Sequence, residues 1–332
     1  MDPPADAGGT DLLTPVRYMT LVFVIAVAVL LASLFLLTRE LGRSPGPSQW
    51  GRTPKWKKRI RVAAAAILVL LVSLLFWSIF IEPNRLVVHQ ETIRIDNWPT
   101  ELSGLRIAII SDIHTGGPFI DDKKLKDIVD NTNALNPDLI VLLGDYMSGN
   151  SWHGHRVEPE VTAAALKELK APLGVYSVLG NHDWWYNGEK VRNALEQNGI
   201  PVLENEVTEI KWHDKSFWLA GLGDLWTRPQ HISETVAKVP PGATIIALTH
   251  NPDIFPNVPH SVPLLLAGHT HGGQVNIPLI GTPIVPSRFG AKYTSGHVFE
   301  NGHHMFVTTG IGTSILPLRF RVPPEIVILT IK

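Results

Sequence analysis

The chain has 332 residues, which is enough for one large domain with additional segments, and only 18% of them are charged. It contains no cysteine, which excludes disulfides, thiolate metal sites and a cysteine nucleophile. Residues 82–332 hold 20 Lys/Arg (29 less nine) against 26 Asp/Glu (30 less four), an acidic balance that argues against nucleic acid as a partner.

Two charge-free apolar runs follow an N-terminal tail of residues 1–18, at residues 19–37 and 62–81. At about 1.5 Å per residue, each helix would be about 30 Å long, enough to cross the hydrocarbon core of a bilayer. Both runs are apolar all round rather than striped, which disfavours the alternative of two buried core helices. We therefore expect a transmembrane hairpin that makes the protein a multi-pass protein of the cell membrane.

The segment between the two runs, residues 38–61, carries eight Lys/Arg and a single acid, Glu40. By the positive-inside rule this loop is cytoplasmic, so the rest of the chain after Ile81 is expected to be extracytoplasmic. A cleaved signal peptide is the alternative for residues 62–81. The run is too long for one and lacks a small-x-small cleavage site. Membrane lipids are therefore expected partners of the anchor and its basic loop.

Residues 82–104 are expected to form a linker whose part 85–95 is a first strand. Beyond it, five short apolar runs are each followed at once by polar residues, at 106–114, 138–146, 174–183, 243–250 and 263–271. Runs of Val, Ile and Leu without alternation are typical of strands buried on both faces. Helical patterns at 123–134, 161–169 and 189–197 separate the earlier strands, which predicts an α/β fold.

Metal-competent side chains stand where each of the five predicted strands stops. They are Asp112 and His114, Asp145, Asn181 with His182 and Asp183, His250, and His269 and His271. Because ligands of α/β sheets bind at the carboxyl ends of strands, we expect these side chains to lie together. Separate core histidines are the alternative, but they would give no reason for the shared placement.

This ligand set contains nitrogen and oxygen but no sulfur, which suits Mn, Fe or Zn. Seven ligands are too many for one catalytic ion, and they suit two divalent ions that share a carboxylate and a bridging hydroxide. Such pairs of ions, about 3.5–4 Å apart, are used for in-line displacement at phosphorus.

The ordered pattern D-x-H, G-D, G-N-H-D, a single H and G-H-x-H resembles that of the calcineurin-like metallophosphoesterases. The segments EPNRLVV, LTHNPDIFP, GHTHGGQVNIP and TTGIGTSILPLRFRVPPEI are similar to the membrane-associated bacterial branch of that family. The resemblance covers residues 105–332 and implies a four-layer sandwich of two mixed β-sheets flanked by helices.

The resemblance also implies roles for the candidate residues. The first ion would be held by Asp112, His114, Asp145 and His271. The second would be held by Asp145, Asn181, His250 and His269, with Asp145 as the bridge. His182 would be a general acid that does not bind metal, oriented by Asp183. The acid that the family often carries two residues after the bridging aspartate is absent, because Met147 stands there.

Trp184 and Trp185, directly after this motif, are candidates for an aromatic rim that contacts an apolar substrate, with core packing as the alternative. Four further histidines lie in polar surroundings and are expected at the surface: His153, His155, His303 and His304. Arg319 and Arg321 are expected to pair locally rather than to bind phosphate.

Together these features predict a membrane-anchored phosphoesterase that hydrolyses phosphomono- or diesters of lipid or cell-envelope molecules with two divalent ions. A membrane-anchored, non-catalytic metal-binding module is the alternative, but every candidate ligand is present. A metallo-β-lactamase-like enzyme would require an H-x-H-x-D-H run, which the sequence lacks. Nothing in the sequence indicates an oligomeric state.

Overall fold

The computed structural model of the chain describes residues 13–42, 55–148 and 156–332. Residues 1–12 of the expected tail, residues 43–54 of the expected basic loop, and His153 and His155 lie outside this range. The chain divides into two compact units, Met1–Ile81 and Glu82–Lys332.

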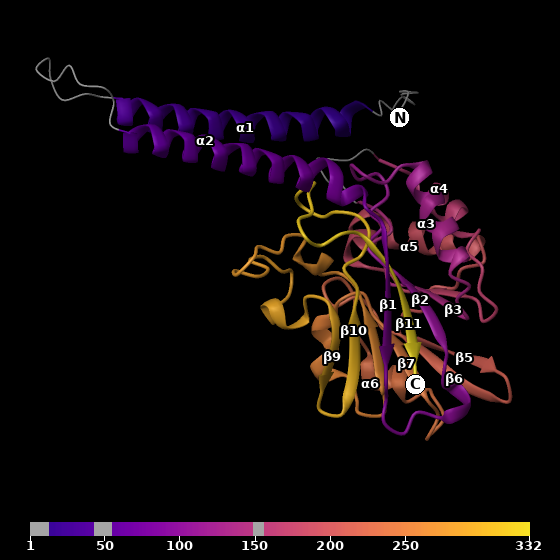
Figure 1. Cartoon of the computed structure of the whole chain (residues 1–332). Coiled ribbons are helices and arrows are strands. Elements are labelled where there is room, and N and C mark those ends of the chain that lie inside the picture. Colours follow the sequence, from indigo (N-terminus) through magenta and orange to yellow (C-terminus); the bar gives the residue numbers. More distant parts are fainter. Residues whose placement is uncertain (1–12, 43–54, 149–155) are drawn as a thin grey trace, which may run out of the picture. The chain divides into compact units, whose positions relative to one another are not determined.

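The N-terminal unit contains two long helices, α1 (Leu13–Gly42) and α2 (Lys55–Phe76), with a π-helical turn at Trp77–Ile81. They lie side by side, and the ring of Phe23 meets those of Phe76 and Phe80 edge-on, at centroid distances of 5.9 and 5.5 Å (Figure 1).

One helix among the described residues is long and apolar enough to cross a membrane, and it runs from Lys55 to Asn84. Among the described residues of α1, the apolar helical stretch is Phe23–Leu36. The structure therefore supports one candidate span where the sequence led us to expect two, and the second span stays a prediction.

The second unit is built on two mixed sheets. Within the described residues the first sheet has five strands, in the order β1 (Val87–Ile93), β11 (Glu325–Ile331), β2 (Arg106–Ile110), β3 (Leu139–Leu142) and β4 (Val175–Ser177). The second has six, in the order β5 (Glu206–Trp212), β6 (Lys215–Gly221), β7 (Ile245–Leu248), β8 (Leu264–Ala267), β10 (His303–Val307) and β9 (Gly296–Glu300). Strands β2, β3 and β4 run parallel to one another, as do β6, β7, β8 and β10.

The sheets pack face to face because alternate residues of each strand point to opposite sides. On β2, for example, Ile107 and Ile109 lie in a core that they share with Leu248 and Leu266 of the second sheet. Ala108 of the same strand faces the other way, toward the helices. This pattern requires strands that are buried on both faces, as the unbroken apolar runs predict.

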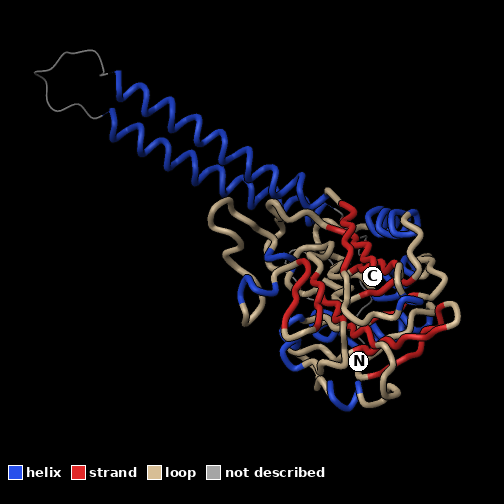
Figure 2. Tube along the Cα trace, turned by 60° about the horizontal axis from the view of Figure 1, so that its bottom comes forward, coloured by secondary structure: helices blue, strands red, loops and turns tan. Residues whose placement is uncertain are grey.

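Helices cover the outer faces of both sheets, which gives four layers. Figure 2 shows the helices in blue around the strands in red. On the first sheet they are α3 (Asp122–Ala134), α4 (Pro159–Leu166) and α5 (Asn181–Gln197). On the second they are α6 (Ile232–Val236) and the 3₁₀ segment Pro252–Asn257. The predicted two-sheet α/β architecture is present.

Two expected surface residues, His303 and His304, are instead buried in β10. This strand lies between β8 and β9, so neither of its edges is free. The ring of His303 packs at 4.6 Å from that of Phe255, and the ring of His304 is stacked on that of His297. The polar residues that precede β10 led us to expect surface positions, because the sequence does not show that the strand lies inside the sheet.

The shared core between the sheets generates a prediction for stability. Replacing the fully buried Leu266 by alanine should lower the free energy of unfolding by about 2–5 kcal/mol, because a cavity forms between the sheets. The same change at the exposed Leu279 should alter it by less than about 0.5 kcal/mol. Chemical denaturation of the full-length protein in detergent measures both, and equal effects would contradict the assignment of Leu266 to the core.

Candidate metal centre

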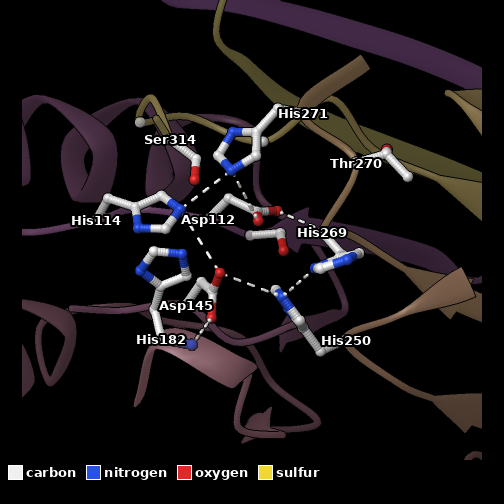
Figure 3. A network of polar contacts seen from close by, with 12 residues as sticks. Asp112, His114, Asp145, His182, His250, His269, Thr270, His271 and Ser314 are labelled. Atoms are coloured by element: carbon white, nitrogen blue, oxygen red, sulfur yellow. Dashed lines mark hydrogen bonds and ion pairs between the residues drawn. The ribbon is translucent and has the colours of Figure 1, made fainter. Parts of the chain in front are cut away.

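The candidate ligands converge at one edge of the two sheets, where parallel strands end. Figure 3 labels all of them except Asn181, which directly precedes His182, whose N–H donates to Asp145. They are Asp112 and His114 after β2, Asp145 after β3, Asn181 at the start of α5, His250 after β7, and His269 and His271 after β8. All are buried, with exposed fractions of 4% or less. Strands of the first sheet thus supply one side of the cluster and strands of the second sheet the other.

In the part of the chain that the structure describes, three groups of side chains are spaced closely enough to bind metal ions. Ligand atoms lie within 4.8 Å of one another in each of these groups: Asp112, His114 and His271; His114, Asp145 and His182; and Asp145, His250 and His269. The first and last groups share no residue, and the middle group shares His114 with the first and Asp145 with the last. The cluster therefore has two ends rather than a single centre.

The carboxylate of Asp145 lies between these two ends. Its Oδ2 is 3.2 Å from Nε2 of His250 and 3.6 Å from Nε2 of His114. Its Oδ1 accepts a hydrogen bond from the backbone N–H of His182 at 2.8 Å. A single carboxylate thus reaches imidazoles from both sheets.

Imidazole nitrogens face one another across the cluster. Nε2 of His114 is 3.1 Å from Nε2 of His271, and Nδ1 of His269 is 3.1 Å from Nε2 of His250. Nε2 of His271 also lies 3.4 Å from Oδ1 of Asp112. Nitrogens at such distances need a shared proton or a shared cation between them, since two lone pairs repel each other.

Several buried ligand atoms have no hydrogen-bond partner in the described structure. They are Oδ1 of Asp112, Oδ1 of Asn181 and Nε2 of His269. Buried polar atoms are nearly always satisfied, so orphaned atoms in one cluster call for an explanation. A carboxylate oxygen, an amide oxygen and an imidazole nitrogen are all donors to Mn, Fe or Zn, so the site fits the divalent ions that its sequence implies.

The electrostatics favour metal binding. Burial lowers the pKa of His114 to about 3 and, together with the positive charge on His250, also lowers that of His269 to about 3. Burial opposes a charge on His250, but the adjacent Asp145 carboxylate outweighs it and raises the pKa of His250 to about 10. Burial would also raise the pKa of Asp145, yet His250 holds it well below its usual range. Most of the imidazoles are therefore neutral, with lone pairs available to a cation.

Most of the candidate ligands have a strained backbone conformation. Five of them have φ between 52° and 70°, in the left-handed region: Asp112, His114, Asp145, His269 and His271. Residues other than glycine rarely adopt this conformation, and it persists only where the surrounding structure enforces it. Gly268 shows how tight the enclosure is, because a Cβ there would lie 2.0 Å from Oγ of Ser111 and 2.7 Å from Oδ2 of Asp112.

The surroundings of His182 and Asp183 differ from the sequence-based expectation. The carboxylate of Asp183 accepts hydrogen bonds from four backbone N–H groups, those of Asp145, Tyr146, Met147 and Gly180, at 2.8–3.1 Å. The partly exposed ring of His182 instead has Nδ1 3.3 Å from the carbonyl oxygen of Ser148. Asp183 therefore holds the loop that carries Asp145.

The two candidate tryptophans have separate environments. Trp184 packs against the core of the first sheet beneath the guanidinium of Arg228, which is 4.3 Å from its ring. Trp185 is exposed, and its ring centroid lies 4.9 Å from that of His182. Core packing therefore accounts for Trp184, whereas Trp185 stands beside the cluster.

A further tryptophan, which the sequence pattern did not reveal, lies on the other side of the cluster. Trp226 is exposed, 4.4 Å from the ring of His269, and lies nearly parallel to Trp185 at a centroid distance of 6.2 Å. Its loop follows β6 and is held by Asp224, which accepts hydrogen bonds from the N–H groups of Trp226 and Thr227. Like the five predicted strands, β6 is followed by a polar residue, Asp224. This pattern in the sequence could have pointed to the loop that carries Trp226.

Arg319 is completely buried and pairs locally, as expected. It donates hydrogen bonds to the carbonyl oxygens of Gly312, Val322 and Thr309, and burial lowers its pKa to about 10. One of its nitrogens lies 3.5 Å from Nδ1 of His271. The pKa of His271 lies well below the usual range, mainly because of burial. The neighbouring His114 and the positive charge of Arg319 lower it further.

Comparisons with known proteins agree with this geometry. A family model for the calcineurin-like phosphoesterases matches residues 105–273. The uncharacterized metallophosphoesterase YkuE of Bacillus subtilis is 32% identical over 257 residues, which are 76% of this chain and 88% of that protein. The phosphodiesterase YaeI of Escherichia coli is 31% identical over 237 residues, covering 68% of this chain and 81% of that one.

A zebrafish (Danio rerio) protein described as a transmembrane protein with a metallophosphoesterase domain is 32% identical over 257 residues, which are 72% of this chain and 56% of that protein. The similarity thus extends well beyond the ligand motifs. With its two mixed sheets and its cluster of aspartates and histidines at the strand ends, the chain belongs to the calcineurin-like phosphoesterase family and is a phosphoester hydrolase.

Proposed function

We propose that this protein is a membrane-anchored phosphoesterase that hydrolyses phosphomono- or diesters at a centre for two divalent ions. The observation that carries the proposal is the buried cluster of seven ligands, which has two ends and orphaned ligand atoms at both of them. The name of the Escherichia coli relative, a phosphodiesterase, supports the diester alternative.

The proposed ligand sets follow the two ends of the cluster. Asp112, His114, Asp145 and His271 hold the first ion, and Asp145, Asn181, His250 and His269 hold the second. When bound, Mn, Fe or Zn ions supply Lewis-acid stabilisation of charge on the phosphoryl oxygens and an activated water nucleophile.

His182 is proposed to protonate the leaving-group oxygen. Its backbone N–H is fixed by Asp145 and its Nδ1 faces the Ser148 carbonyl oxygen, which leaves Nε2 as the atom available to a substrate. Unlike the ligands, the His182 ring is only partly buried, so an ester can reach it. Asp183 keeps the Asp145 loop in place and thereby positions both groups.

Two substitutions test these roles. Asp145→Asn should lose bound metal together with activity, because it removes the charge shared by both ends of the cluster. His182→Ala should keep its metal and lower kcat by about 10²–10⁴-fold, the usual contribution of a general acid. Asp130→Asn and His231→Ala, at exposed positions, are matched controls. Metal content by mass spectrometry decides the outcome, and a metal-free His182→Ala protein would make His182 a ligand instead.

The helix Lys55–Asn84 is proposed to anchor the protein in the cell membrane, with the phosphoesterase domain outside the cytoplasm. Its length and composition support the anchor, and the similarity to a transmembrane relative agrees with it. The charge-free run 19–37 supports a second span within α1, and the basic segment 38–61 supports a cytoplasmic loop.

Reporter fusions test this topology. A reporter enzyme that is active only outside the cytoplasm should be active when fused after Lys332 and inactive within residues 44–51. The reverse pattern would overturn the orientation. A cysteine in place of Ala5 counts the spans, because the chain has no other cysteine. An impermeant maleimide should label it from outside if α1 crosses the membrane, and should fail to do so if only one helix does.

A lipid or cell-envelope phosphoester is the proposed substrate class. The exposed rings of Trp185 and Trp226 lie beside His182 and His269. An apolar part of a substrate can therefore pack against these two rings while its phosphoester reaches the metal centre. The short connection from Asn84 to β1 keeps the domain close to the anchor, where lipid head groups are concentrated.

Activity in liposomes tests this substrate class. The full-length enzyme should have a higher kcat/KM on phospholipid-type esters than on matched soluble ones. Trp185→Ala and Trp226→Ala should each lower the former by about threefold to tenfold, as loss of one aromatic contact does. Phe299→Ala, at an exposed position on β9, should not. A preference for soluble esters that neither tryptophan variant changes would exclude lipid substrates and leave the phosphoesterase assignment intact.

A further inference from the structure

Two loops of the phosphoesterase domain expose aliphatic side chains to an unusual degree. Leu279 is fully exposed, and Ile280, Ile284, Ile315 and Leu316 have exposed fractions of 72, 71, 74 and 50%. We call these five residues the apolar tip surface. Neither 276–287 nor 313–318 contains a charged residue, although exposed loops are usually polar. Grouped exposed aliphatics of this kind mark contact with a protein or a membrane.

Hydrogen bonds join the two loops into one structure. The side-chain amide of Gln274 donates to the carbonyl oxygens of Leu316 and Leu318, at 2.9 and 3.0 Å, and its carbonyl oxygen accepts from the N–H of Ser314. A backbone bond from the N–H of Phe320 to the carbonyl oxygen of Gln274 adds a bridge between the same segments. The two loops are therefore joined at their bases and are not independent.

This surface lies at the same end of the domain as the metal centre. Gln274 follows the ligand His271 after two glycines, and the N–H of Gly312 donates to the carbonyl oxygen of Asp112. Figure 1 shows the orange and yellow loops at the end of the strands opposite the hairpin that joins β9 and β10.

The chain also enters the domain from the candidate span at this end. β1 runs parallel to β11, with Val87 opposite Glu325, and the N–H of Val87 donates to the carbonyl oxygen of Pro324 at 2.9 Å. The residues that precede the two strands, namely the end of the span at Asn84 and the loop 313–322, therefore share one end of the sheet. Since β11 is antiparallel to β2, it is the end where β2 stops and Asp112 follows.

We propose that the apolar tip surface inserts into the outer face of the bilayer and turns the metal centre toward the lipid head groups. The chain enters the domain at this end, and five exposed aliphatic residues without a neighbouring acid are what an interfacial contact requires. Arg321, exposed in the same loop, adds a positive charge that suits anionic head groups. The inference rests on the proposed anchoring by Lys55–Asn84, but not on the identity of the substrate.

Site-specific fluorescence tests it, and the absence of native cysteine makes each label unique. Single cysteines replace Ile280, Leu316 or Phe299 in the full-length protein and carry a polarity-sensitive dye. Phe299 is the control, because it is exposed on β9 at the opposite end of the sheet. The protein is reconstituted in phosphatidylethanolamine–phosphatidylglycerol vesicles, with or without lipids that carry a nitroxide on the acyl chain.

The labels at 280 and 316 should shift their emission to the blue and lose most of their intensity to the nitroxide lipids, whereas the label at 299 should do neither. Protein that floats with the vesicles but keeps both labels in water would overturn the docking and leave the anchor standing. Protein that does not float would overturn anchor and docking together. A blue shift without nitroxide quenching would mean that a second copy of the chain covers the surface, which also overturns the proposal.

A second measurement follows the enzyme. Ile280→Asp places a charge in the bilayer contact and should lower turnover of a vesicle-borne ester while leaving turnover of a soluble ester unchanged. Equal turnover of the vesicle-borne ester by the variant and the parent would contradict the proposed docking. If the unsubstituted protein hydrolyses neither ester, that result would instead count against the proposed function.

Discussion

The carboxylate of Asp145 contacts groups from both sheets, and the arrangement of the whole domain is needed to make this possible. His114 comes from the end of β2 and His250 from the end of β7, strands of different sheets that are held together by the apolar core between them. A ligand cluster tolerates displacements of a few tenths of an ångström, so the packing of Ile, Leu and Val between the sheets sets its geometry. The packing that stabilises the fold therefore also sets the geometry of the site.

The positions of the ligands could be predicted because they depend on a local rule. An unbroken apolar run predicts a buried strand, and the residue that follows lies at the carboxyl edge of the sheet, whatever the long-range topology. Features that depend on backbone groups or on strand order could not be predicted. Asp183 was assigned to its sequence neighbour His182, whereas its partners are four backbone N–H groups, which no side-chain pattern reveals.

The same distinction explains the remaining differences. Trp226 reaches the cluster from a loop with a single polar signal, Asp224, and its approach to Trp185 depends on the packing of one sheet against the other. The buried state of His303 and His304 follows from the place of β10 inside its sheet, which is a matter of strand order.

The pairing of the first and last strands has a consequence for how the domain is completed during synthesis. β11 lies between β1 and β2, and His89 of β1 bonds to Glu325 of β11 across 236 residues of sequence. Until the C-terminal strand arrives, β1 has no partner and β2 presents an open edge, which is a template for pairing with other chains. Contacts of such large sequence separation form slowly because a long loop must close first. The strand nearest the anchor is thus the last to be joined to the sheet, and a chain cut short before Glu325 would leave an unfinished sheet held close to its anchor.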